Sequence, residues 1–140
     1  MQRTILIVED DLDVVESLKL ILEGKGFNVI HALDKESGLE LARDAKPDLI
    51  ILDIMMPSGT EGFHFVWALR KEPDKAVRDI PIIVISSIHH TTELRFYPHQ
   101  RDAVYEPGEY LPVQAFLDKP VDPDDLLRTL SNVLGDKRDV

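Results

Sequence analysis

The chain has 140 residues, of which 44% are hydrophobic, and this is enough to build one domain with a substantial core. Its 26 acidic residues outnumber the 16 basic ones and give a net charge of −10. Direct binding to nucleic acid needs basic patches, so we expect none here. The lack of cysteine excludes disulfides, thiolate metal sites and cysteine nucleophiles.

The first apolar run, at residues 4–8, has the length of a strand. It is too short for a signal peptide or a membrane span, so we expect no membrane association. A cytoplasmic location is the expectation that follows.

Apolar runs of strand length alternate with segments of helical periodicity. The pattern predicts strands at residues 4–8, 27–32, 48–53, 81–86 and 115–118. It predicts helices at residues 12–24, 35–45, 61–72 and about 123–134. Asp122 and Pro123 form a typical start for the last helix, and Gly135 a typical end.

This alternation is typical of the α/β class, with a parallel sheet and helices on both of its faces. Right-handed crossovers favour a doubly wound, flavodoxin-like fold of five strands, for which 2-1-3-4-5 is a common strand order. We expect a single domain over residues 1–140, with its core at about 4–134 and a polar tail at 135–140.

Residues 87–114 interrupt the rhythm between the fourth and fifth strands. Because Pro98, Pro107 and Pro112 fall within this stretch, one long helix does not fit it. We expect an atypical folded excursion with one or two short helices.

Polar side chains stand at the ends of four of the predicted strands. These residues are Glu9 and Asp10, Asp53, Ser86, and Lys119. In an open α/β sheet, ligands bind beyond the carboxyl ends of the strands. In the order 2-1-3-4-5, the first and third strands are neighbours, so the three carboxylates should meet at one edge.

A cluster of carboxylates repels itself unless a cation joins it. Hard oxygen ligands select Mg²⁺, with Mn²⁺ as an alternative, and such a dication can also receive phosphate oxygens. Asp53 could then act as a nucleophile and form an aspartyl phosphate. Lys119 would supply a cation, and Ser86 a hydroxyl donor, to the phosphoryl oxygens.

Four motifs in chain order resemble the receiver domain of two-component response regulators. They are Ile-Leu-Ile-Val-Glu-Asp-Asp at 5–11, Leu-Asp-Ile-Met-Met-Pro at 52–57, Ile-Val-Ile-Ser-Ser at 83–87 and Phe-Leu-Asp-Lys-Pro at 116–120. The resemblance covers roughly residues 4–134 apart from the excursion. It implies that Glu9 and Asp10 are the acidic pair around Mg²⁺, that Asp53 is the phosphoacceptor, and that the carbonyl of Met55 completes the metal site.

The resemblance also implies the parts of a conformational switch. Lys119 corresponds to the phosphate-binding lysine, with a cis bond to Pro120, and Ser86 to the switch hydroxyl. Phe116 corresponds to the aromatic residue that turns inward. The expected donor is the phosphohistidine of a histidine kinase or phosphotransfer protein, and the downstream protein is not identified. Whether the protein forms a homodimer is left undecided by the sequence.

Other functions compete with a phosphorylation-controlled switch. A degenerate receiver would bind partners without phosphorylation. Aspartate-nucleophile phosphatases place a second Asp two residues after the nucleophile, where this chain has Met55, so we do not expect an enzyme. A flavodoxin-like cofactor binder needs a phosphate loop after the first strand, where residues 9–11 are acidic instead.

Three smaller expectations complete the sequence analysis. Met55 and Ile88 occupy the positions that tune dephosphorylation in the family, and both are apolar, which predicts a long-lived aspartyl phosphate. Asp11 either extends the acidic pocket or caps the first helix. Phe63, Val66 and Trp67, at helical spacing, are expected in the core.

Overall fold

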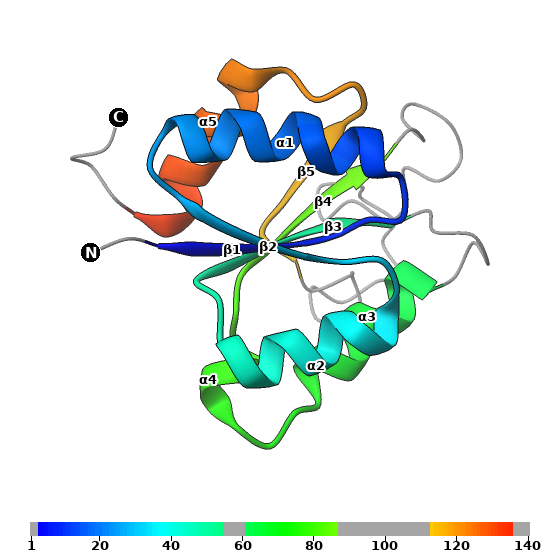
Figure 1. The fold of residues 1–140 in the computed structure, drawn as a ribbon. Helices are drawn as coiled ribbons and strands as arrows, with labels where there is room; N and C mark the ends of the chain where they lie inside the picture. The colour runs from blue at the N-terminus through cyan, green and yellow to red at the C-terminus, as the bar shows by residue number, and fades with distance from the viewer. Residues whose placement is uncertain (1–2, 55–60, 87–112, 136–140) are drawn as a thin grey trace, which may run out of the picture.

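The computed structural model describes residues 3–54, 61–86 and 113–135, which form a parallel sheet covered by helices on both faces (Figure 1). The strands are β1 (Thr4–Val8), β2 (Asn28–Ala32), β3 (Leu49–Asp53), β4 (Ile82–Ser86) and β5 (Ala115–Asp118). The helices are α1 (Leu12–Gly24), α2 (Lys35–Ala45), α3 (Glu61–Arg70), α4 (Lys75–Arg78) and α5 (Pro123–Leu134). The five strands lie in the order β2-β1-β3-β4-β5, which confirms the predicted topology.

Two hydrophobic layers hold the helices to the sheet. Successive residues of a strand face opposite sides, so Ile5 and Ile7 of β1 pack with α1 and α5, whereas Leu6 and Val8 pack with α2 and α3. Figure 1 shows these helices on the two faces. The central strands β1, β3 and β4 are buried on both sides, which explains their continuous apolar sequences.

Aspartates begin the helices that leave the carboxyl edge of the sheet. The side chain of Asp11 accepts a hydrogen bond from the backbone N–H of Asp13 at 2.9 Å and caps α1. Of the two roles left open for Asp11, the structure therefore shows the cap. Asp122 caps α5 in the same way, and Gly135 ends that helix with a positive φ of 68°, as predicted.

The region after β3 differs from the prediction in two respects. Helix α3 ends at Arg70, because Pro73 disfavours helical geometry in the residue before it, and a separate single turn, α4, follows the Asp74 cap. The expectation that Trp67 is buried was wrong, since this side chain is 39% exposed. Val66 is fully buried as expected, Phe65 is fully buried although it was not predicted, and the side chain of Phe63 lies outside what the structure describes.

The predicted excursion at residues 87–114 lies outside the described residues except for its last two positions. Among the described residues, no helix has both the length and the apolar character needed to cross a bilayer.

Candidate functional site

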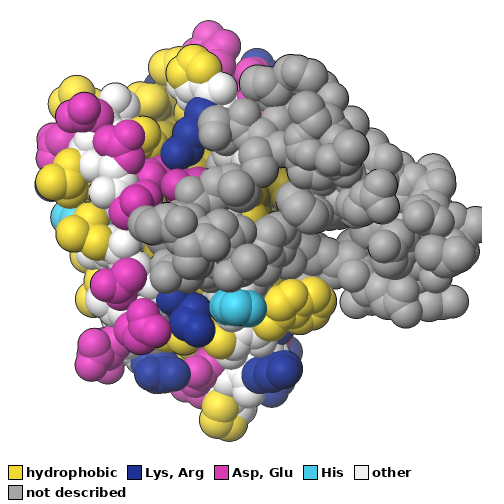
Figure 2. Space-filling view, turned by 90° about the vertical axis from the view of Figure 1, so that its right-hand side faces the viewer, with side chains coloured by type: hydrophobic (Ala, Val, Ile, Leu, Met, Phe, Trp, Pro, Cys, Tyr) yellow, Lys and Arg dark blue, Asp and Glu magenta, His cyan; other side chains and the backbone are white. Residues whose placement is uncertain are grey.

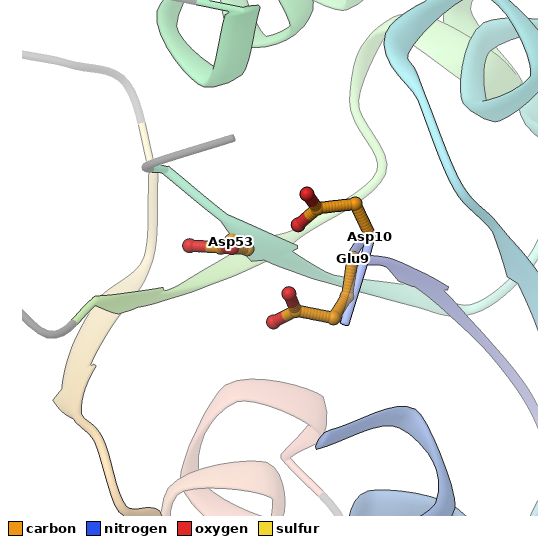
Figure 3. A group of neighbouring side chains, drawn as sticks. All are labelled: Glu9, Asp10 and Asp53. Carbon is orange, nitrogen blue, oxygen red and sulfur yellow. The ribbon is translucent and has the colours of Figure 1, made fainter. Parts of the chain in front are cut away.

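The ends of β1 and β3 bring the three predicted carboxylates together. Val8 pairs with Leu52 in the parallel register, so the next residue of each strand, Glu9 and Asp53, lie side by side. Figure 3 shows Glu9, Asp10 and Asp53 projecting from this edge toward a common space. One oxygen from each of the three carboxylates lies within 4.8 Å of the others, which is close enough to share one ion.

Glu9 is the most deeply buried of these carboxylates. Its backbone N–H donates to the carbonyl of Ala32 at 3.0 Å, and its Oε2 accepts from the backbone N–H of Asp11 at 3.1 Å. Burial, reinforced by the nearby Asp53, raises the pKa of Glu9 from 4.5 to about 7, although Lys119 opposes the change. Protonation of Glu9 is therefore balanced near neutral pH.

Lys119 brings one positive charge into the cluster. Its Nζ lies 3.0 Å from Glu9 Oε1 and 3.3 Å from Asp53 Oδ2. Burial alone would lower the pKa of Lys119, but the two carboxylates outweigh it and the pKa is raised. The implied cis bond between Lys119 and Pro120 is present. The contact with Glu9 was not among the sequence predictions, which paired the ammonium with phosphoryl oxygens.

Ser86 lies on β4, the strand next to that of Asp53, and Phe116 lies on β5, one strand further out. Ser86 ends β4 and is 5% exposed, and its carbonyl accepts from the backbone N–H of Lys119 at 2.9 Å. Phe116 is half-buried in β5, where it pairs with Val84 and packs against the hydrophobic layer shared with α2 and α3. The sheet thus places the candidate switch residues on adjacent strands. Met55 lies outside the described residues.

The donor set fits a hard dication. Glu9 Oε1 is buried and, among the described residues, has no partner of hydrogen-bond geometry, although Lys119 lies at salt-bridge distance. A buried carboxylate oxygen needs a cation or a donor, and here the Lys119 ammonium is the group within reach. Three carboxylates and one ammonium leave a negative excess, and oxygen donors of this kind suit Mg²⁺.

The surroundings of the site are acidic. Figure 2 looks onto this edge of the molecule, where several Asp and Glu side chains lie among hydrophobic ones on the left of the described surface. The net charge of −10 also favours the approach of cations to the protein as a whole.

A pocket of about 480 Å³ opens beside Lys119, between α1 and the turn that follows β5. Its apolar lining comes from both elements and consists of Val14, Leu18, Ile21, Pro120 and Val121. Asp13, Ser17 and Lys119 supply the polar part of the lining. Lys119 therefore connects the pocket to the carboxylates.

The comparisons with known proteins agree with this architecture. The family model of the response regulator receiver domain matches residues 5–131. The chain therefore belongs to this family, whose members are signalling modules that bind Mg²⁺ at an acidic pocket.

Individual relatives cover the chain to different extents. Protein PilH of Pseudomonas aeruginosa is 34% identical over 131 residues, which cover 94% of this chain and 97% of PilH. The phosphate regulon transcriptional regulatory protein PhoB of Escherichia coli is 37% identical over 87 residues, which cover 62% of this chain and 37% of PhoB. The solved chemotaxis response regulator CheY4 of Vibrio cholerae superimposes with a TM-score of 0.76 at 27% identity and covers 95% of this chain and 99% of its own.

Proposed function

We propose that this chain is a phosphorylation-controlled switch in which Asp53 accepts a phosphoryl group from the phosphohistidine of a histidine kinase or phosphotransfer protein. The observation that supports this most strongly is the geometry around Asp53. Its carboxylate shares one small space with Glu9 and Asp10 and lies 3.3 Å from the Lys119 ammonium.

The carboxylates of Glu9, Asp10 and Asp53, with the carbonyl of Met55, would hold the Mg²⁺ ion, and Mn²⁺ could replace it. The closeness of the three carboxylates, which exceed the single Lys119 ammonium in charge, supports this assignment. When bound, the dication supplies neutralisation of the charge on the phosphoryl oxygens.

In the transfer, one carboxylate oxygen of Asp53 forms a bond to phosphorus while the phosphorus–nitrogen bond of the donor breaks, and the imidazole keeps the electron pair. Lys119 offsets charge on the phosphoryl oxygens, and the Ser86 hydroxyl donates to one of them. Phosphoryl transfer depends mainly on this positioning and charge compensation.

The phosphoryl group would change partner affinity through β4 and β5. Ser86 moves toward the phosphoryl oxygens, and Phe116 turns into the space that it leaves. Because both residues lie on strands at one side of the sheet, a local change in charge is converted into a change of surface. The downstream partner reads that surface.

The pocket beside Lys119 is where we expect the donor protein to make contact. It is mostly apolar, it is large enough to receive side chains, and Lys119 lies in its lining. A protein seated there would bring its phosphohistidine close to Asp53.

Intact-mass measurement after incubation with acetyl phosphate and Mg²⁺ tests the proposal. The wild type should gain the mass of one phosphoryl group, and removal of Mg²⁺ with a chelator should prevent the gain. Asp53→Asn should gain nothing, whereas Asp44→Asn, which alters an exposed carboxylate on α2, should behave like the wild type. An unmodified wild type, or equal modification of Asp53→Asn, would overturn the proposal.

A further inference from the structure

Arg70, at the C-terminal end of α3, is a half-buried cation that the phosphoacceptor site does not use. Burial lowers its pKa, so the charge is kept there at a cost. Its Nη1 donates to the carbonyls of Arg78 at 2.8 Å and Ile80 at 2.7 Å, which precede β4. Hydrogen bonds from a charged donor are stronger than neutral ones, so Arg70 firmly joins α3 to the entry of β4.

Gln114 extends this connection to β5. Its Oε1 accepts from Arg70 Nη2 at 3.4 Å, a long hydrogen bond, and from the backbone N–H of Ile82 at 2.7 Å. The backbone N–H of Gln114 in turn donates to the carbonyl of Ile82 at 2.8 Å. Gln114 is thus tied to the first residue of β4 by side chain and backbone together, and Arg70 supports the same point.

This connection secures the start of β5, and the hydrogen bond from the Lys119 N–H to the Ser86 carbonyl secures its end. The strand β5 has four residues and lies at the edge of the described sheet, and none of its residues is fully buried. A slip of one residue would reverse the faces of its side chains. Lys119 follows β5 directly, about 17 Å along the strand from Gln114, at roughly 3.3 Å per residue. The register at the start of β5 therefore contributes, together with the Lys119 N–H to Ser86 carbonyl bond, to where the ammonium lies.

We propose that Arg70 and Gln114 are positioning residues that hold β5 in register with β4 and thereby keep the Lys119 ammonium beside Asp53. The functional part of this proposal rests on the proposed role of Asp53, but the structural part does not. Both residues act through Lys119, since they lie at the opposite end of β5 from the carboxylates.

The variants that test this proposal are Arg70→Met, which replaces the aliphatic stem and removes the guanidinium, and Gln114→Leu at an exposed position. Gln114→Glu is the conservative variant, because its carboxylate can still accept from both donors. Arg43→Met is the matched control, since it removes an exposed arginine whose Nη2 lies 2.9 Å from Glu72 Oε2.

Amide hydrogen exchange in increasing urea measures how easily β5 opens locally, and it needs no phosphorylation. Arg70→Met and Gln114→Leu should make the β5 amides exchange at least tenfold faster, through a local opening that depends little on urea. The β1 and β3 amides should still exchange through global unfolding, and Gln114→Glu and Arg43→Met should resemble the wild type. If β5 exchange in Arg70→Met continues to follow global unfolding, the proposal is wrong.

The rate of phosphorylation by acetyl phosphate, measured where all variants are folded, tests the link to Lys119. Arg70→Met should slow the reaction at least fivefold, and Gln114→Glu should retain the wild-type rate. In a Lys119→Met background, Arg70→Met should have no further effect, because the group that it positions is gone. Independent, multiplying effects of the two substitutions would overturn the proposal. A wild type that is not phosphorylated would instead refute the proposed function, and the exchange experiment would still decide whether Arg70 and Gln114 hold β5.

Discussion

The strands β3 and β5 supply opposite charges to one site from very different surroundings. Every residue of β3 is buried, and this central strand ends in the carboxylate of Asp53. The edge strand β5 is only partly buried, and the ammonium of Lys119 follows it. Under the proposed function, β3 would hold the acceptor in place and β5 would move in response, because close-packed interiors resist displacement more than the edges of a sheet do.

Removal of the Lys119 ammonium should have the largest effect on phosphorylation. It deletes the positive charge that follows β5 and leaves the Asp53 carboxylate of β3 in place. We expect Lys119→Met to slow phosphorylation by acetyl phosphate about 10³-fold, roughly 4 kcal/mol, through loss of charge compensation. Mass spectrometry over time measures the rate. Lys75→Met, at an exposed position on α4, is the control, and a loss of less than threefold in Lys119→Met would contradict the role of this residue.

Truncation of one buried side chain on each strand compares their packing directly. Ile51→Ala in β3 should lower the free energy of unfolding by about 3 kcal/mol, because the substitution leaves a cavity in the fully buried layer. Leu117→Ala in β5, whose side chain is partly buried in that same layer, should cost only about 1 kcal/mol. Urea denaturation measures both, and equal losses would show that β5 is as firmly packed as β3.

The affinity for Mg²⁺ should depend on pH through Glu9. Because the pKa of Glu9 is about 7 without metal, the ion must displace a proton below that pH. We expect the Kd for Mg²⁺ to rise about tenfold for each pH unit below about 7 and to stay level above it. Isothermal titration calorimetry of wild type and Glu9→Gln checks this. The pH dependence of the Kd should disappear in Glu9→Gln. If it persists in that variant, a group other than Glu9 causes it.

The raised pKa of Glu9 also predicts how its protonation affects the free energy of unfolding in the absence of metal. Glu9 binds its proton more tightly in the folded chain, at about 7, than at the ordinary value of 4.5 expected on unfolding. Its contribution is therefore fully present below about pH 4.5 and is lost as the pH rises through about 7. Saturating Mg²⁺ should restore the lost stability at pH 8, and thermal denaturation at both pH values measures it.

Substitution of two glycines by alanine should change the free energy of unfolding least. One glycine lies in a closely packed part of the helical layers and the other in an open part. A Cβ on Gly38 of α2 would lie 3.0 Å from Phe65 Cε1 and 3.1 Å from Val8 Cγ2, so Gly38→Ala should destabilise the protein by about 1 kcal/mol. Gly24, at the end of α1, has no such neighbour within 4 Å, and Gly24→Ala should be neutral or stabilising by up to about 1 kcal/mol. Destabilisation by Gly24→Ala equal to that by Gly38→Ala would contradict the contrast.

The strand order and the meeting of Glu9, Asp10 and Asp53 could be predicted because they follow from local patterns and one general rule. Continuous apolar runs mark buried strands, and parallel strands end at a common edge. The polar residue at each strand end was therefore sufficient to place the candidate site.

Other features depend on how helices are rotated and where side chains end in space, which no local sequence pattern specifies. The burial of Phe65 in place of Trp67 depends on how α3 is rotated against the sheet. The contact of Lys119 with Glu9 depends on where a long side chain ends, and the connection between Arg70 and Gln114 joins residues 44 positions apart. Such contacts follow from the assembled fold, so sequence periodicity could not reveal them.

The most direct test of the central claim is to identify the residue that receives the phosphoryl group. After treatment with acetyl phosphate, reduction by borohydride converts an aspartyl phosphate to homoserine, and mass spectrometry of the peptides locates it. The account predicts homoserine at position 53 alone, and only when Mg²⁺ or Mn²⁺ was present. Modification at another residue, or modification of Asp53 that is indifferent to divalent cations, would contradict it.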